Sequence, residues 1–453
     1  MNRLFLENSI SDILNNFKRR QFSPESLIDA SLSNIRELDP KYFAWVRHRH
    51  GGVSELSIKQ SFENCSSQAG LLENIPVGVK DILNTVDFPT EMGSPIWKDF
   101  NPGNDARVVF NIKRQGAVVI GKTVTAEFAV HTLGKTLNPY DITKTPGTSS
   151  SGSAVAVTLG MVPFATGTQT AGSIVRPASF CGVYGCKPSF GTIPRTGSLK
   201  TTDSLDTAGF FVIHQSDLRR GFDSMRIVGK DYPISNSALS DKGRQCKPAG
   251  RPWRVGFVKT HTWKYAPQYA RDAVEGFVKK LALIRDIKVI EAILPVAMEQ
   301  THIVHEIIYN KALAYYFKKE YQNPRFVSPV MKQLIDYGEH VNIEDYKNAL
   351  SLQMELIYEM DHLFDQYDIL VSLSTAGEAP LREVTELPDP ALMWTMTHLP
   401  VVSVPKFTSP NGMPFGIQVV ARKYNDYLLF SFLDYLTSIE VIPVKAGYFV
   451  PSR

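Results

Sequence analysis

Hydrophobic and polar positions in the first part of the chain predict two helices followed by alternating strands and helices. Apolar residues recur at three- and four-residue spacing over 9–19 and 23–38, which indicates two paired amphipathic helices. Ser23 and Pro24 suit the start of the second helix, and Asp39-Pro40 is expected to end it. The pattern then predicts a buried strand at 75–82, a helix at 105–115, a strand at 117–120 and a short helix at 125–130.

The remainder of the chain continues this alternation of strands and helices. Its pattern predicts strands at 190–194, 210–213 and 254–258, a loop at 235–251, helices at 271–283 and 302–321, strands at 369–373, 399–404 and 416–420, and a helix from Asn425. No convincing linker, repeat or low-complexity tract interrupts the chain. We therefore expect an α/β fold in one domain spanning 1–453, with a more helical, substrate-specific insert at about 215–365.

Composition narrows the class of protein. The 453 residues are 43% hydrophobic and 21% charged, as in globular proteins with a sizeable core. The net charge of +4 and the lack of a basic cluster with aromatic residues argue against nucleic-acid binding, and the basic run 18–20 is expected to be a solvated helix end. There is neither an apolar leader segment nor a run of 18 apolar residues, so we expect a cytoplasmic protein without a membrane partner.

Cysteine and histidine spacing predicts no metal site. The four cysteines, Cys65, Cys181, Cys186 and Cys246, are too few and too scattered for a disulfide framework, which suggests a reducing compartment. A single His-x-x-His pair on the helix expected at 302–321 is more often packed or superficial than metal-binding. We expect no metal and no organic cofactor.

One segment imitates a nucleotide-binding loop. Residues 116–123, Gly-Ala-Val-Val-Ile-Gly-Lys-Thr, match the P-loop pattern letter for letter. In a P-loop the four intervening residues form the loop and a helix begins at the Lys-Thr pair, whereas here the four residues are themselves the predicted strand. Thr123-Val124-Thr125 is also a poor helix start. We reject nucleotide binding for this segment.

The most unusual stretch consists of two small, hydroxyl-rich turns that bracket the apolar run 154–165. The first turn lies at 144–153 and the second at 167–177. Small residues allow backbone to approach a ligand closely, and serines in such turns can be nucleophiles or simply turn-makers. Upstream, Lys80 lies within the apolar strand 75–82, where it either reaches water at the strand end or has a function.

The residues do not support an α/β-hydrolase triad, because neither Ser149 nor Ser173 lies in a Gly-x-Ser-x-Gly elbow. Lys80 in its strand and the two serine turns instead resemble the amidase signature family, over most of the chain. The resemblance implies a single large α/β domain whose mixed central sheet is flanked on both faces by helices. It also implies a Ser-Ser-Lys triad.

Carried over by resemblance, Ser173 is the nucleophile, Ser149 a bridging serine on a cis peptide bond and Lys80 the base. The amides of Thr170, Ala171, Gly172 and Ser173 would form the oxyanion hole. A lysine can act as a base only when neutral, and shifting its pKa from about 10.4 to near 7 costs the charged form roughly 4–5 kcal/mol. Burial in an apolar strand can supply that shift.

The chain departs from the commonest pattern of the family at several positions. Gln169 replaces the usual aspartate, Val175 replaces the usual arginine and Arg176 follows it, while Thr148, Ser151 and Ala171 stand where glycine is usual. A Gln-Thr-Ala-Gly-Ser branch of the family shares the differences in the second turn. The triad is intact, but details of the oxyanion loop and acyl pocket are open.

Three functional hypotheses remain open at this point. The first is a hydrolase that cleaves a carboxamide of a small molecule through an acyl-enzyme on Ser173. The second keeps the acyl-enzyme but passes the acyl group to an amine, as in specialised-metabolite assembly, or releases ammonia within an amidotransferase complex. The third is a non-catalytic scaffold. Substrate-binding residues are unknown, with the least patterned segments near Met92, 130–140, the insert and 393–397 as candidates, and a homodimer is one open assembly state.

Overall fold

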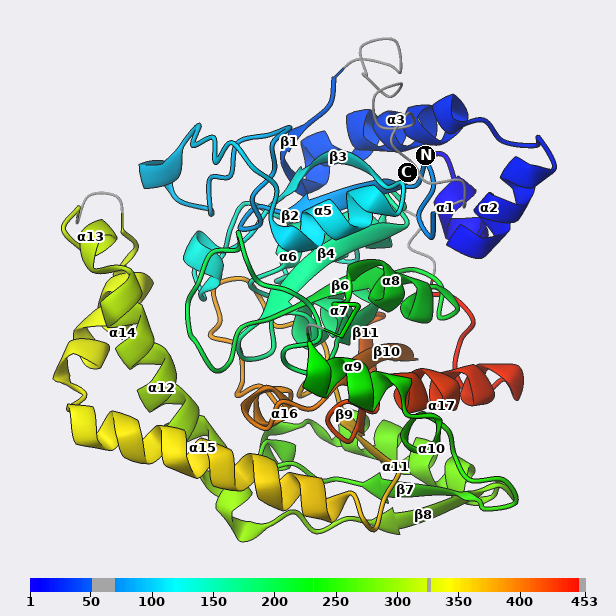
Figure 1. Ribbon diagram of the computed structural model, residues 1–453, viewed down its shortest axis with the longest axis vertical. Coiled ribbons are helices and arrows are strands. Elements are labelled where there is room, and N and C mark those ends of the chain that lie inside the picture. The colour runs from blue at the N-terminus through cyan, green and yellow to red at the C-terminus, as the bar shows by residue number, and fades with distance from the viewer. Residues whose placement is uncertain (51–69, 231, 324–326, 448–453) are drawn as a thin grey trace.

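The structure is a computed structural model that describes residues 1–50, 70–230, 232–323 and 327–447 (Figure 1). These residues form an 11-stranded sheet in the order β1-β3-β2-β4-β6-β5-β10-β11-β9-β7-β8. The strands are β1 Trp45–His48, β2 Pro76–Lys80, β3 Val118–Thr123, β4 Phe164–Gln169, β5 Tyr184–Lys187, β6 Thr207–Val212, β7 Trp253–Phe257, β8 Ile287–Glu291, β9 Ile369–Leu373, β10 Val401–Thr408 and β11 Pro414–Ala421.

The sheet is mixed. Strand β2 pairs in parallel with β3 and β4, and β7 pairs in parallel with β8 and β9, whereas the strands between these groups pair antiparallel. Helices lie on both faces (Figure 1). The expected fold class is therefore confirmed.

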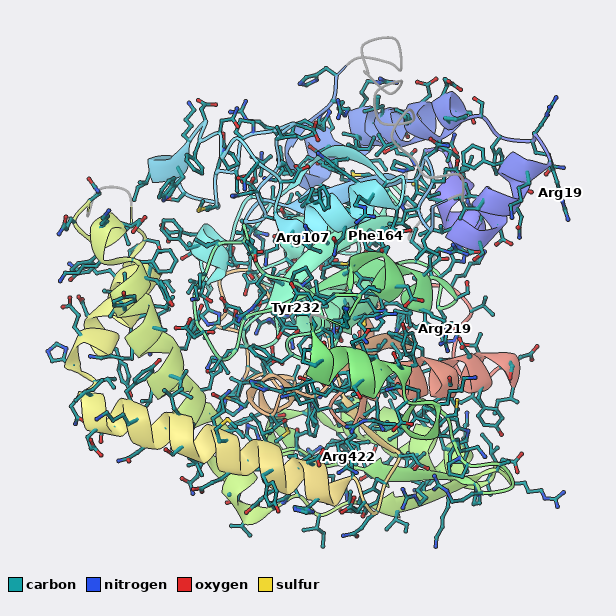
Figure 2. All side chains as sticks on the ribbon, viewed as in Figure 1. Arg19, Arg107, Phe164, Arg219, Tyr232 and Arg422 are labelled. Carbon is teal, nitrogen blue, oxygen red and sulfur yellow. The ribbon has the colours of Figure 1, made fainter. Side chains whose placement is uncertain are left out.

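The α-helices show where local sequence signals decide an element. They are α1 Leu4–Glu7, α2 Ile10–Lys18, α3 Pro24–Tyr42, α5 Arg107–Arg114, α6 Ser151–Thr158, α7 Val175–Cys181, α8 Asp217–Met225, α9 Pro233–Ser240, α10 Lys242–Gln245, α11 Gln268–Ala282, α12 Thr301–Tyr316, α13 Lys318–Tyr321, α14 Pro329–His340, α15 Ile343–Leu363, α16 Leu392–Met396 and α17 Asp426–Ser438. The Ser9 and Ser23 hydroxyls accept backbone amides at the starts of α2 and α3, as in capping boxes. The basic run after α2 is exposed, and Figure 2 shows Arg19 at the periphery.

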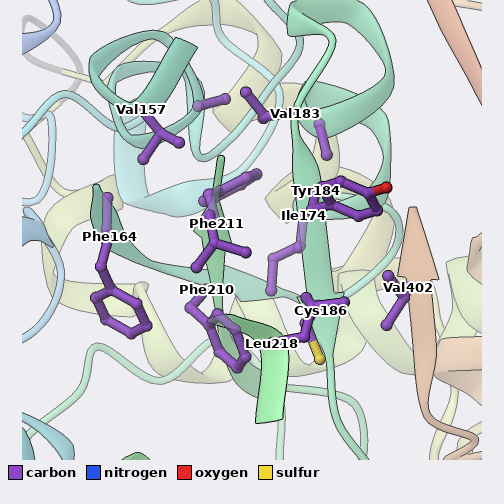
Figure 3. Close-up of a cluster of buried hydrophobic side chains, with 14 of the residues drawn as sticks. Val157, Phe164, Ile174, Val183, Tyr184, Cys186, Phe210, Phe211, Leu218 and Val402 are labelled. Carbon is purple, nitrogen blue, oxygen red and sulfur yellow. The ribbon is translucent and has the colours of Figure 1, made fainter. Parts of the chain in front are cut away.

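The centre of the core lies between α6, α7 and the strands β4, β5 and β6. Figure 3 shows its side chains, among which Phe164 and Phe210 stack with ring centroids 5.3 Å apart. Every residue of α6 is buried. The apolar run between the two serine turns thus forms an all-round buried helix followed by strand β4, which anchors both turns in the core.

Four local predictions were wrong. Helix α3 continues through Pro40 to Tyr42, and the Asp39 carboxylate accepts the Ala44 amide at 2.6 Å beyond its end. Residues 190–194 are a loop, because Ser189 accepts local bonds from the Thr192 amide and hydroxyl. Residues 235–251 contain most of α9 and all of α10. Residues 125–130 contain only a 3₁₀ turn, η3 Glu127–Ala129.

The segment that imitates a P-loop is a strand, as expected. Strand β3 includes Lys122 and Thr123, and β3 pairs in parallel with β2. The Lys122 ammonium lies 3.0 Å from the Asp81 carboxylate, and both side chains are fully buried. Burial raises the pKa of Asp81 to about 6 and lowers that of Lys122. The lysine of the motif therefore belongs to a buried ion pair next to Lys80.

The range 215–365 is mostly helical but contributes β7 and β8 to one end of the sheet. The division into one domain with an insert stays a prediction.

None of the helices in the described ranges combines the length and apolar character that a membrane span requires. Cys65 lies outside the described residues, whereas Cys181 and Cys186 are buried free cysteines.

Candidate active site

Lys80 ends strand β2 and its side chain is fully buried. Its side-chain nitrogen Nζ lies within hydrogen-bond distance of three hydroxyl oxygens, those of Ser149 at 2.8 Å, Ser150 at 2.9 Å and Thr168 at 2.8 Å. Burial lowers the pKa of Lys80 well below the ordinary value of 10.5, and the Asp206 carboxylate opposes only part of this shift. The surroundings of Lys80 therefore favour a neutral amine.

The first serine turn places Ser149 beside Lys80. The peptide bond between Thr148 and Ser149 is cis, as the resemblance implied. Gly147 has a φ of 86°, and a Cβ atom there would lie 2.9 Å from Pro177 Cα, so the position requires glycine. The carbonyl of Ser149 accepts the Ala126 amide at 3.0 Å. Helix α6 begins two residues later.

The second serine turn connects β4 to α7 and carries Ser173, which is buried except for 5% of its surface. Within the described part of the chain, the amides of Ala171, Gly172 and Ser173 donate to no protein acceptor. The Ser173 hydroxyl likewise forms no hydrogen bond to any other residue that the structure describes. Unpaired amides on a short loop before a helix are suited to hold a developing oxyanion.

Gln169 supports this loop from behind. Its side-chain oxygen accepts the amides of Ile174 at 2.9 Å and Val175 at 3.0 Å, at the start of α7. Its side-chain nitrogen donates to the Thr395 hydroxyl at 3.0 Å, and that hydroxyl donates to the Ala171 carbonyl at 2.6 Å. An uncharged amide can accept on one side and donate on the other, which an aspartate could not do.

Arg176 joins the two serine turns, a role that the sequence did not reveal. Its guanidinium donates to the Thr148 carbonyl at 3.0 and 3.3 Å. It also forms ion pairs with Asp389 at 3.0 Å and Glu386 at 2.8 Å. Only 5% of the Arg176 surface is exposed. Arg176 thus holds the Thr148 carbonyl, next to Ser149. This contact is a physical role for an arginine one position after the one that is usual in the family.

A cavity of about 290 Å³ opens beside Lys80's partner Thr168. It is lined by Ile82, Ala129, Thr168, Thr170, Arg195, Thr196, Ser198, Leu199, Lys200, Thr201, Asp206, Thr207 and Ala208. Asp206 accepts hydrogen bonds from three threonine hydroxyls, including that of Thr170 at 2.8 Å. The loop between β5 and β6 therefore supplies most of this wall, and neither Met92 nor 393–397 contributes to it.

The histidines expected to be packed or superficial are packed. His305 Nε2 lies 3.0 Å from the Thr170 carbonyl, and His302 contacts the His261 ring. No cluster of three metal-binding side chains occurs in the ranges that the structure describes.

Comparison with known proteins assigns the family. The sequence profile described as "Amidase" matches residues 26–430, which is most of the chain. The chain belongs to the amidase family. Its membership confirms the resemblance to amidase signature enzymes and the expected enzyme class, an amidase that acts on carbon–nitrogen bonds.

Relatives and solved structures cover nearly the whole amidase chain. It is 26% identical to a glutamyl-tRNA(Gln) amidotransferase subunit of Alkaliphilus metalliredigens, over 93% of this chain and 94% of that protein. It is also 26% identical to "Putative amidase AmiD" of Mycobacterium bovis, over 93% and 91%. The native peptide amidase from Stenotrophomonas maltophilia superimposes with a TM-score of 0.82 at 23% identity, over 99% of both chains. These proteins comprise an amidotransferase subunit and two proteins named as amidases.

Proposed function

We propose that this amidase cleaves the carboxamide of a small molecule through an acyl-enzyme on Ser173, with Ser149 as relay and Lys80 as base. The observation that carries the proposal is the surroundings of Lys80. It is a fully buried lysine with a lowered pKa, and its three side-chain partners are hydroxyls, one of them Ser149 at 2.8 Å. A neutral amine hydrogen-bonded to serine is the requirement for activating a hydroxyl nucleophile.

The reaction proceeds in two halves. Ser173 Oγ bonds to the amide carbon while its proton passes through Ser149 to Lys80, and the carbonyl oxygen becomes an oxyanion held by the amides of 170–173. The tetrahedral adduct then breaks its C–N bond, and the amine leaves with the proton returned from Lys80 through Ser149. Water attacks the resulting ester by the same proton path and releases the acid, which restores the Ser173 hydroxyl. None of these steps requires a metal or an organic cofactor.

The nucleophile is tested by Ser173→Ala with a panel of small carboxamides and a fluorophosphonate probe. We expect loss of turnover, and covalent labelling of the wild-type protein at Ser173 only. Labelling of another residue, or full turnover by the variant, would show that the assignment is wrong. Absence of any labelling and any turnover would instead favour the scaffold alternative.

A second candidate function keeps the same acyl-enzyme but changes the acceptor or the assembly. The relative that is an amidotransferase subunit favours it, since it matches over 93% of this chain. Product analysis with and without added amines distinguishes acyl transfer from hydrolysis. Glutaminase activity that appears only with a co-purifying partner would favour a role in an amidotransferase complex, whereas amide hydrolysis by the isolated chain, as a monomer or homodimer, would favour the amidase.

A further inference from the structure

Residues 126–131 form a strained turn that is tied to the first serine turn. The Ala126 amide donates to the Ser149 carbonyl at 3.0 Å, and the Phe128 amide donates to the Met92 carbonyl at 2.8 Å. Phe128 and Ala129 follow with φ values of 48° and 58°, in the left-handed region that residues with side chains rarely adopt. Strain of this kind persists where the surroundings impose it and is concentrated at functional sites. The turn leads directly to His131.

His131 differs from the residues before it because its side chain is exposed, whereas Phe128, Ala129 and Val130 are buried. Its imidazole ring packs edge-on against Tyr309, with centroids 6.3 Å apart. Tyr309 in turn contacts His305 at 5.3 Å, and His305 Nε2 lies 3.0 Å from the Thr170 carbonyl. Three rings therefore form a continuous row from an exposed imidazole to the loop of the candidate oxyanion hole.

The His131 side chain is exposed, yet protein groups near both serine turns act on it. Its pKa is lowered because the imidazole lies deep among protein atoms, and the nearby Arg176 guanidinium and His305 lower it further. This combination is the one expected of a side chain that lines a cleft. Arg176 and His305 contact the first and second serine turns respectively, so the cleft lies beside both.

The row of rings carries no available positive charge at neutral pH. Burial lowers the pKa of His305 to about 4, so both histidines are neutral. The charge of Arg176 is matched by Asp389 and Glu386. A carboxylate brought to this wall would lose hydration without gaining a free cationic partner. A flat uncharged ring would instead gain contacts with aromatic surfaces.

We propose that His131, backed by the buried rings of Tyr309 and His305, lines the substrate cleft and selects amides whose acyl group is an uncharged flat ring. The inference rests on the proposed acyl-enzyme at Ser173 and adds the class of acyl group that the enzyme accepts. His131 acts through contact with the substrate, and it takes no part in proton transfer. Its removal changes selectivity between acyl groups and leaves the triad intact.

Boronic acids test the wall because they form reversible adducts with a serine nucleophile without requiring turnover. Phenylboronic and cyclohexylboronic acid differ in the flatness of the ring, and methylboronic acid has no ring. Dissociation constants are measured by calorimetry for the wild-type protein and for His131→Ala, His131→Asn and His131→Phe. In His131→Ala and His131→Asn, we expect the preference for phenyl over cyclohexyl to fall about 3- to 10-fold. His131→Phe should retain the preference, and methylboronic acid should bind all four proteins alike.

The outcomes separate the two proposals. Ser173→Ala serves as the negative control for adduct formation. If the wild-type protein forms no adduct with any boronic acid, the acyl-enzyme proposal fails and the inference fails with it. If adducts form but the phenyl preference is the same in wild-type, His131→Ala and His131→Asn proteins, only the inference is overturned. Tighter binding of 3-carboxyphenylboronic than of phenylboronic acid by the wild-type protein would also overturn it. His131→Asn keeps a polar side chain at an exposed position and decides the matter should the alanine variant not fold.

Discussion

Replacing Lys80 with methionine tests whether the lysine is neutral in the folded protein. An unfolded lysine at pH 7 is charged, so holding it neutral in the fold costs about 5 kcal/mol. Methionine has a similar length and no charge, and it removes this cost. It also removes the three hydrogen bonds of Nζ, each worth about 1 kcal/mol. We therefore expect Lys80→Met to be inactive and yet at least as stable as the wild type at pH 7, by about 0–2 kcal/mol.

The pH dependence supplies the sharper measurement. The pKa of Lys80 is lowered by folding, so the unfolded state binds more protons between the folded pKa and the ordinary value of 10.5. The stability contributed by Lys80 is therefore fully present above 10.5 and is lost as the pH falls toward the folded pKa. Relative to Lys80→Met, the wild-type free energy of unfolding should rise with pH in this window, by up to about 1.4 kcal/mol per pH unit.

Urea unfolding followed by tryptophan fluorescence, at pH values from 7 to 10, measures this difference. Lys122→Met is the matched control, because Lys122 is equally buried on the neighbouring strand but is paired with Asp81 at 3.0 Å. Its loss leaves an unpaired buried carboxyl group, and we expect destabilisation of about 3–5 kcal/mol. A wild-type minus Lys80→Met difference that is flat or falls with pH would mean that Lys80 is charged in the fold and cannot act as the base.

Three further predictions concern the turns around the site. Ser149→Ala should lower kcat by about 10²- to 10⁴-fold. Ser150→Ala should lower kcat less, because Lys80 keeps its contacts with the Ser149 and Thr168 hydroxyls. Equal losses in the two variants would contradict the relay. Arg176→Met removes the ionic partner of the buried Asp389 carboxylate and should destabilise the protein by about 3–5 kcal/mol, as measured by urea unfolding. Arg176→Lys should cause a smaller loss of stability. An unchanged urea midpoint for Arg176→Met would argue against the bridge between the turns. Gly172→Ala should reduce both stability and activity, because its Cβ would lie 1.6 Å from an Asp389 oxygen. In the control Gly276→Ala, on a helix, the added Cβ has no atom within 4 Å, so this variant should be neutral or stabilised by up to about 1 kcal/mol. Normal activity of Gly172→Ala would show that the loop adapts.

The sequence predicted best where a single local pattern decides the structure. The strand at 369–373 was predicted to the residue, because this apolar run has the length of a strand and is too short for a typical helix. The buried strand before Lys80 and the strand character of the false P-loop followed from the same signal. The predicted strand at 190–194 is instead a loop. Its residues are partly apolar, but the Thr192 hydroxyl and local backbone hydrogen bonds stabilise a turn there. Hydrophobic periodicity does not report such bonds.

For the candidate site, the sequence by itself supplied Lys80, Ser149 and Ser173, together with the small residues that the two turns require. The two small turns and the lysine within an apolar strand are visible as local patterns, whereas the choice of these three residues came from the resemblance to the amidase signature family. The structure then showed that Lys80 contacts the first turn and that its environment favours the neutral form. The catalytic roles themselves remain predictions.

Only the tertiary structure decided which distant residues support these groups. Asp389 lies 213 positions along the chain from its partner Arg176. Thr168, whose hydroxyl contacts Lys80, lies 88 positions from that lysine. The loop that lines the cavity and the ring row from His131 to Thr170 likewise join separate elements. A long-range contact of this kind depends on how β4, α7 and α12 pack, and neither the periodicity nor the spacing of one segment contains that information.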